Sequence, residues 1–242
     1  MKNYKIVIEY DGSDFNGWQI QPEKPTVQGK IQDTIRQISN EDIPLHGSGR
    51  TDSGVHARGQ TANFSLSREI DILSFKKSLN ALLKPAITIS SMEEVPNTFH
   101  SRFSAKSRLY NYNITTEYMP LERSKYWYID YDLDRDTLDE CAIIIVGEHD
   151  FSSFSKLNIE VDNKRCNILE SFWKYDNHML RYYIRSNRFI HHMVRFLVGT
   201  MIEVARDRFL INDFRQLLSN NSKTTAFKAP AKGLILESVS YE

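Results

Sequence analysis

The sequence is poor in the features that mark several large classes of protein. Its 242 residues include only two cysteines, Cys141 and Cys166, which argues against a disulfide scaffold and fits a reducing compartment. The apolar runs are shorter than the roughly 20 residues that a membrane span needs, and the first residues lack the apolar stretch of a secretory signal. We therefore expect a cytoplasmic, globular protein that does not act at a membrane.

Motifs for metals and nucleotide cofactors are missing as well. The sequence contains no C-x-x-C, no H-E-x-x-H, no Walker A loop and no dinucleotide-binding glycine pattern. Its seven histidines are dispersed except for His191 and His192. The sequence therefore predicts no metal site and no small-molecule cofactor.

Charge of one sign is not in excess, because 31 basic and 31 acidic side chains balance. Their distribution is uneven, however. Residues 130–140 are mostly acidic, whereas Arg181, Arg185, Arg188 and Arg195 follow one another with no acid between them. A balanced total can thus conceal a basic binding face, although scattered solvated charge explains it equally well.

A glycine-rich segment, GSGRTDSGVHARGQ at residues 47–60, carries the strongest signal for chemistry. Asp52 is the only carboxylate in this part of the chain, while Arg50, Arg58 and Arg68 are cationic. Opposite charge favours an ionised carboxylate, which can act as a nucleophile or a general base. A structural Asx turn or helix cap is the alternative. We predict that Asp52 is a catalytic carboxylate working beside a polyanion.

A second segment, FHSRFSAKSRLYNY at residues 99–112, interleaves basic side chains with aromatic rings and small hydroxyls. Unpaired bases stack on aromatic rings, while arginine, lysine and serine hold phosphates. We interpret Tyr112 as a core aromatic. The predicted RNA contacts in this segment are Arg102, Lys106, Arg108 and Tyr110.

The third segment, RFIHHMVRFLVG at residues 188–199, falls in a helix predicted from about Ile190 to Arg206. Arg195 lies beside the apolar arc of this helix, so we expect it to be partly buried and paired with a carboxylate. Asp52 is the obvious partner for a bidentate pair. His191 is predicted one turn before Arg195 on the same side, with a purely structural histidine as the alternative.

Hydrophobic periodicity predicts an α+β fold with mostly antiparallel mixed sheets and helices on one face. A split near residues 100–106 gives an N-terminal subdomain, 1–104, and a C-terminal subdomain, 105–242. The polar stretch Leu157–Lys164 is predicted to be a loop. The other predicted helices are Val27–Ile38, with Thr26 as its cap, Asp71–Leu83, Leu133–Val146 and Asn212–Leu218. The predicted strands are Tyr4–Tyr10, Ile43–Ser48, Gln60–Leu66, Ala86–Val95, Arg108–Thr115, Ser171–Tyr175, Leu180–Arg185 and Gly233–Val239.

The order of these segments resembles the tRNA pseudouridine synthase A family nearly from end to end. The blocks that carry the resemblance are YDGSDFNGWQIQP, GSGRTDSGVHA, FHSRFSAKSRLYNY, GEHDFSSF, NRFIHHMVRFLVG and APAKGLILESVSY. The resemblance implies that Asp52 is the catalytic aspartate and that Arg50 replaces the flipped-out base. It also implies that Tyr110 stacks on the target uracil and that Arg195 pairs with Asp52.

As a whole, the resemblance implies isomerisation of uridine to pseudouridine at positions 38, 39 and 40 in the anticodon stem-loop of tRNA. It further implies a homodimer, and two similar subdomains with the active-site cleft between them. Substrate binding is expected from Arg50, Arg58, Arg102, Lys106, Arg108, Tyr110 and His191. A non-catalytic RNA-binding or tRNA-folding module is the main alternative. A metal-dependent hydrolase is the other, but it needs a cluster of acids where Asp52 is alone.

Overall fold

The computed structural model describes residues 1–155, 163–219 and 225–242, which divide into two compact units. Unit 1 comprises Met1–Lys106 and Ile235–Glu242, and unit 2 comprises Ser107–Leu234. The predicted loop at Leu157–Lys164 lies largely outside the described residues. None of the described helices has the length and apolar character required to cross a membrane.

Unit 1 contains a mixed sheet whose order is β4 (Ile87–Val95), β1 (Lys2–Tyr10), β3 (His56–Leu66) and β10 (Leu234–Ser240). Strand β1 is antiparallel to both of its neighbours, and the short β2 (His46–Gly47) is antiparallel to β3. Strand β10 runs parallel to β3, with Ile235 opposite His56. The sequence predicts that this C-terminal strand belongs to the subdomain 105–242. It lies in unit 1 because a parallel strand can return over a long connection, which local sequence does not reveal.

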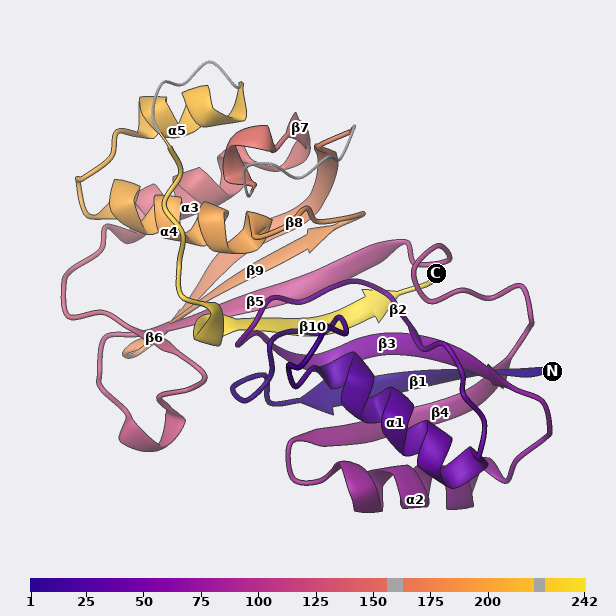
Figure 1. Ribbon diagram of the computed structural model, residues 1–242. Helices are drawn as coiled ribbons and strands as arrows, with labels where there is room; N and C mark the ends of the chain where they lie inside the picture. The colour runs from indigo at the N-terminus through magenta and orange to yellow at the C-terminus, as the bar shows by residue number, and fades with distance from the viewer. Residues whose placement is uncertain (156–162, 220–224) are drawn as a thin grey trace. The chain divides into compact units, whose positions relative to one another are not determined.

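Helices α1 (Val27–Ser39) and α2 (Ile72–Leu83) pack on each other in unit 1, and α2 also packs on β4 (Figure 1). Thr26 caps the first turn of α1, as predicted, and Asp71, predicted as the first residue of its helix, is the cap of α2. The alternation along β1 and the helical spacing bring one apolar face of each element together. The buried residues include Tyr4, Ile6, Ile8, Ile31, Ile35, Phe64, Leu79 and Ile89.

Unit 2 has the strand order β5 (Ser107–Thr115), β9 (Met179–Ser186), β8 (Arg165–Asp176) and β7 (Gly147–Asp150), and each neighbouring pair is antiparallel. The short β6 (Trp127–Tyr128) is parallel to β5. Helices α3 (Arg135–Ile144), α4 (Met193–Ala205) and α5 (Ile211–Leu218) pack against one another, so they form one layer. Single turns of 3₁₀ helix occur at Pro120–Glu122, Ser152–Phe154 and Ala231–Gly233.

The predicted α+β class with mostly antiparallel mixed strands is confirmed, but several element boundaries differ. Helix α4 begins at Met193, not Ile190, because His192 has a left-handed backbone with φ of 68°. The strand predicted at Ile43–Ser48 is reduced to β2. Strand β8 begins at Arg165, before the predicted start, and β7 was not predicted.

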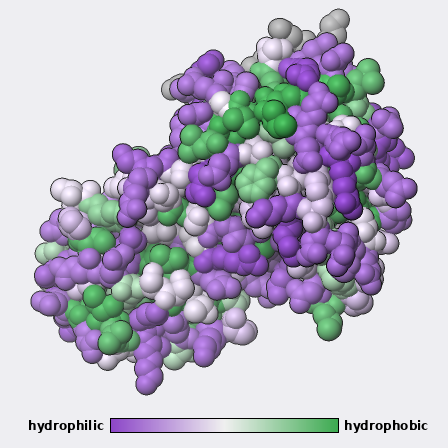
Figure 2. Space-filling view, turned by 180° about the vertical axis from the view of Figure 1, so that it is seen from behind, coloured by the Kyte–Doolittle hydropathy of each residue, from purple (hydrophilic) through white to green (hydrophobic). Residues whose placement is uncertain are grey.

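Exposed apolar side chains are dispersed over both units. On the face shown in Figure 2, hydrophobic residues form separate groups among hydrophilic ones. Single exposed hydrophobic residues are ordinary on protein surfaces. The exposed large ones include Leu73, Phe103, Tyr118, Leu121, Leu169, Phe172 and Leu210.

Candidate active site

The loop that carries Asp52 connects β2 to β3, and a buried polar network fixes the point where it leaves the sheet. The Ser48 N–H donates to the Thr61 carbonyl at 2.8 Å, and the Ser48 hydroxyl donates to Gln60 Oε1 at 2.7 Å. Gln60, which is fully buried, donates in turn to the Gly49 carbonyl at 3.0 Å. Buried hydrogen bonds to strand β3 therefore fix the position of the first residues of the loop.

The segment between β1 and α1 supports the far side of the same loop. The Trp18 N–H donates to the Thr51 carbonyl at 3.1 Å, and the Gly54 N–H donates to the Phe15 carbonyl at 3.4 Å. The Ser53 hydroxyl also donates to the Phe15 carbonyl, at 3.2 Å. Two loops that are more than 30 residues apart in sequence thus share backbone hydrogen bonds around Asp52.

Two glycines allow these backbones to approach so closely. A Cβ atom on Gly12 would lie 2.0 Å from the Val55 carbonyl oxygen, and one on Gly17 would lie 2.6 Å from the Thr51 carbonyl oxygen. Gly17 also has φ of 91°, which side-chain-bearing residues rarely adopt. The close approach itself was not predicted, although the glycines of DGSDFNGW are its signal in the sequence.

A buried hydroxyl pair lies directly before the candidate carboxylate. Tyr10 Oη and Thr51 Oγ1 are 2.7 Å apart, and both side chains are buried. Burial raises the pKa of Tyr10 well above its ordinary value, so its phenol stays neutral at physiological pH. The backbone at Thr51 is therefore held by a side chain from β1 as well as by Trp18.

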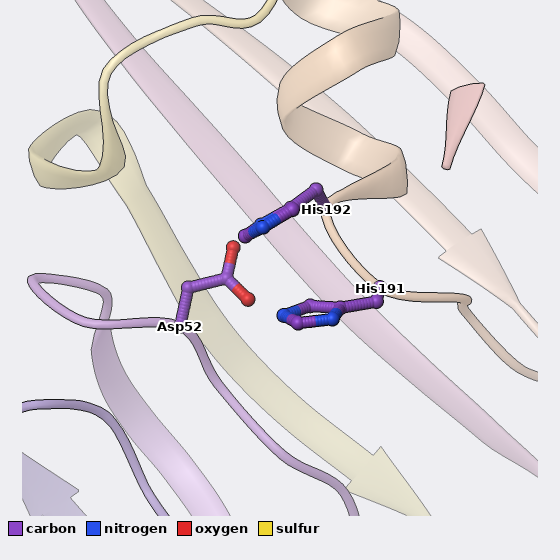
Figure 3. Close-up of side chains that lie close together, drawn as sticks. All are labelled: Asp52, His191 and His192. Carbon is purple, nitrogen blue, oxygen red and sulfur yellow. The ribbon is translucent and has the colours of Figure 1, made fainter. Parts of the chain in front are cut away.

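Asp52 itself is half-buried, between the buried Thr51 and the exposed Ser53. Its carbonyl oxygen accepts the Val55 N–H at 3.1 Å, which closes a tight turn. Figure 3 shows the Asp52 carboxylate leaving the loop that precedes β3. Arg50, two residues earlier, is exposed. The main chain is thus fixed on both sides of a carboxylate that retains access to solvent.

The other two arginines near Asp52 in sequence have partners elsewhere in unit 1. Arg58 forms an ion pair of 2.7 Å with Glu237 of β10. Burial raises the pKa of Glu237, and the Arg58 charge opposes this shift. Arg68 donates to the Ser39 carbonyl at 3.4 Å. Arg58 therefore links two strands, and its predicted contact with substrate stays a prediction.

In unit 2, Tyr110 lies on β5 opposite Ile184 of β9 and is only 8% exposed. Its ring makes an edge-to-face contact with Phe189, with centroids 5.1 Å apart. Tyr112, two residues along, is fully buried and donates its hydroxyl to the Pro230 carbonyl at 2.7 Å. The interpretation of Tyr112 as a core aromatic is confirmed.

Arg195 lies in the first turn of α4 and is half-buried. Its Nε donates to the Ala229 carbonyl at 2.9 Å, and the Ala229 N–H donates back to the Arg195 carbonyl at 2.9 Å. A Cβ atom on Gly199 would lie 2.4 Å from the Phe227 carbonyl oxygen, so only glycine permits this close contact with the helix. The segment 227–230 therefore sets the position of the Arg195 side chain.

The two adjacent histidines precede α4 and are not part of it, as Figure 3 shows. Their rings stack with centroids 4.0 Å apart, and His191 is exposed. The prediction that His191 lies one helical turn before Arg195 is wrong. The left-handed backbone of His192 means that the helix begins only at Met193, so His191 lies outside it.

The predicted RNA-contacting cations of residues 99–112 differ in their surroundings. Arg102 and Lys106 are exposed in unit 1. Arg108 in unit 2 is half-buried and donates to the Asn187 carbonyl at 2.9 Å. The first two are accessible to a polyanion, whereas Arg108 also orders the turn after β9.

The family model described as tRNA pseudouridine synthase matches residues 6–104 and 141–242. The chain belongs to this family. Among its relatives is a tRNA pseudouridine synthase A from Caldicellulosiruptor saccharolyticus that is 38% identical over 100% of both chains. Proteins of the same name from Borreliella afzelii and Chlorobium limicola are 37% and 40% identical, again over 100% of both chains. The match contains the loop of Asp52 and the helix of Arg195, and the full-length relatives also span Tyr110.

Proposed function

We propose that this protein isomerises uridine to pseudouridine in tRNA and that Asp52 is the catalytic carboxylate. Family membership supports the reaction, since full-length relatives carry the name tRNA pseudouridine synthase A. The observation that carries the assignment to Asp52 is its loop. Backbone hydrogen bonds, and the close contacts of Gly12 with Val55 and of Gly17 with Thr51, hold the main chain on both sides of a half-buried carboxylate.

The reaction breaks the N1–C1′ bond of uridine and forms a C5–C1′ bond, so the product has the same atoms as the substrate. The C5 proton is lost and N1 gains a proton. An ionised Asp52 serves this reaction either as a nucleophile or as a general base on the sugar. The target nucleotide must first leave its stack to be reached.

The other roles follow from the resemblance and are part of the proposal. Arg50, exposed at the loop surface, fills the space of the extruded base. Tyr110 packs on the uracil, and its edge contact with Phe189 restrains the ring. Arg195, restrained by Ala229, orients the carboxylate of Asp52. Arg102 and Lys106 hold phosphates.

The remaining expectations are also proposals. The sites are positions 38, 39 and 40 of the anticodon stem-loop, the enzyme works as a cytoplasmic homodimer, and Arg58, Arg108 and His191 assist in binding tRNA. Mapping pseudouridine in tRNA from cells that lack the gene, with and without a restoring copy, tests the positions directly.

The decisive experiment compares Asp52→Asn with the wild-type protein on tRNA labelled with tritium at C5 of uridine. The variant is expected to fold and to bind tRNA with an unchanged Kd but to release no tritium. Asp42→Asn, at an exposed carboxylate in the same unit, is the control and should release tritium at the wild-type rate. Release by Asp52→Asn would refute the role of Asp52. Binding without release by the wild-type protein would instead favour the non-catalytic RNA-binding module.

A further inference from the structure

Three aromatic rings of unit 1 meet at the protein surface and form what we call the ring cluster: His46, His100 and Phe103. The ring centroids of His46 and His100 are 4.9 Å apart, and those of His100 and Phe103 are 4.4 Å apart. Phe103 is 76% exposed, and His46 is exposed as well. A single exposed phenylalanine is common on protein surfaces, but three rings in contact present a continuous aromatic surface.

The main chain beneath the ring cluster is fixed by Ser101, which is fully buried. Its N–H donates to Asn63 Oδ1 at 2.9 Å, and its hydroxyl donates to the His46 carbonyl. Its own carbonyl accepts the Tyr241 hydroxyl at 2.8 Å. Ser101 thereby ties the two segments that carry the rings, so a ligand would find them already ordered and would not bear the entropic cost of ordering them.

The central ring of the cluster is neutral. The Arg102 N–H donates to His100 Nδ1 at 3.1 Å, so this nitrogen carries no proton. Burial, followed by the nearby His46 and the Arg102 charge, lowers the pKa of His100. The ring therefore offers a face for stacking at physiological pH.

Positive charge lies directly beside these faces. The guanidinium carbon of Arg102 is 5.6 Å from the centroid of the Phe103 ring, and the side chain is exposed. Aromatic faces next to an exposed guanidinium are suited to bind an unpaired nucleotide. Its base can stack on a ring, and its phosphate can bind the guanidinium. A base pair inside a duplex cannot offer its face in this way.

We infer that the ring cluster binds an unpaired base of the RNA substrate, with Arg102 on a neighbouring phosphate. The inference extends the proposed function, because it takes tRNA as the RNA. The cluster contains none of the catalytic candidates, so it should govern affinity and not the chemical step.

Phe103→Ala tests the inference, with Phe103→Tyr as the variant that keeps a ring. The control is Leu73→Ala on α2, which removes a 79% exposed side chain of the same unit. Kd is measured for an unmodified tRNA transcript, a short oligouridylate and an RNA duplex of equal length. kcat and KM are measured by tritium release from tRNA.

Loss of one stacking contact should weaken binding of tRNA and oligouridylate about tenfold in Phe103→Ala and leave duplex binding and kcat unchanged. Phe103→Tyr and Leu73→Ala should match the wild-type protein. Unchanged oligouridylate binding in Phe103→Ala would overturn the inference, as would an equal loss on the duplex or in Leu73→Ala. If the wild-type protein released no tritium, the proposed function would fail, while the oligouridylate and duplex measurements would still decide the role of the cluster.

Discussion

The loop of Asp52 in unit 1 and the helix of Arg195 in unit 2 are positioned by different kinds of contact. Asp52 belongs to a turn whose main chain lies against the main chain of another loop, with Gly12 at the closest point. Arg195 belongs to a buried helix, and a coil segment accepts its side-chain N–H through the carbonyl of Ala229. Backbone contacts position Asp52, whereas core packing of α4 and the hydrogen bond to Ala229 position Arg195.

This difference predicts how each region responds to damage. A loop held by its backbone can shift without opening a core, so its disturbance should appear first in activity. Helix α4 is buried over most of its circumference, with Leu197, Val198, Met201 and Ile202 among its buried residues. Its disturbance should appear first in the free energy of unfolding.

Among substitutions that leave Asp52 and Arg195 themselves unchanged, the largest effect is expected for Gly12→Ala. The added methyl group would lie 2.0 Å from the Val55 carbonyl oxygen, so the loop of Asp52 must move. A shift of about 1 Å in a catalytic group should lower kcat about 100-fold. The added methyl group in a closely packed contact should also lower the unfolding free energy by about 1–3 kcal/mol. Tritium release and urea denaturation measure the two quantities.

Gly49→Ala is the matched control, because a methyl group there meets nothing within 4 Å. Its unfolding free energy should stay close to that of the wild-type protein. Wild-type kcat in Gly12→Ala would show that the contact with Val55 does not position Asp52.

The next largest effect is expected for Gly199→Ala in α4. Glycine to alanine inside a helix normally raises stability by about 0.5–1 kcal/mol, but here the methyl group would lie 2.4 Å from the Phe227 carbonyl oxygen. We expect a net fall of about 1–3 kcal/mol in the unfolding free energy, read from urea denaturation. A rise would mean that the coil segment yields freely and does not restrain Arg195.

The sequence predicted the helices and strands that depend on residues close together in the chain. The cap at Thr26 and the apolar spacing of α1 and α2 each depend on residues a few positions apart, and the structure contains them. The strand that carries Tyr112, predicted at Arg108–Thr115, is likewise found at Ser107–Thr115. These features depend on neighbours in sequence, so a single chain is sufficient to find them.

Features that depend on distant contacts were missed. Glu237, the partner of Arg58, is 179 residues away in the sequence, so local charge gives no sign of this ion pair. The parallel pairing of β10 with β3 likewise has no local signal. The left-handed backbone of His192 breaks a pattern that apolar spacing alone extends to Ile190. For Arg58 and β10, contacts with distant parts of the chain decide the outcome.

Effects on the unfolding free energy no larger than these are expected from removing one hydroxyl in each region. The bond between Tyr10 and Thr51 is fully buried, so Tyr10→Phe leaves a shielded hydroxyl without this partner and should cost about 1–3 kcal/mol. The bond from Tyr112 to the Pro230 carbonyl is only partly buried, so water can replace the lost donor and Tyr112→Phe should cost about 0.5–1.5 kcal/mol. Urea denaturation of both variants gives the order directly. A larger loss of stability in Tyr112→Phe would contradict this order. It would show that the hydrogen bond to Pro230 stabilises unit 2 more than the pair of Tyr10 and Thr51 stabilises the loop of Asp52. A side-chain hydrogen bond would then matter at least as much in unit 2 as it does in the loop of unit 1.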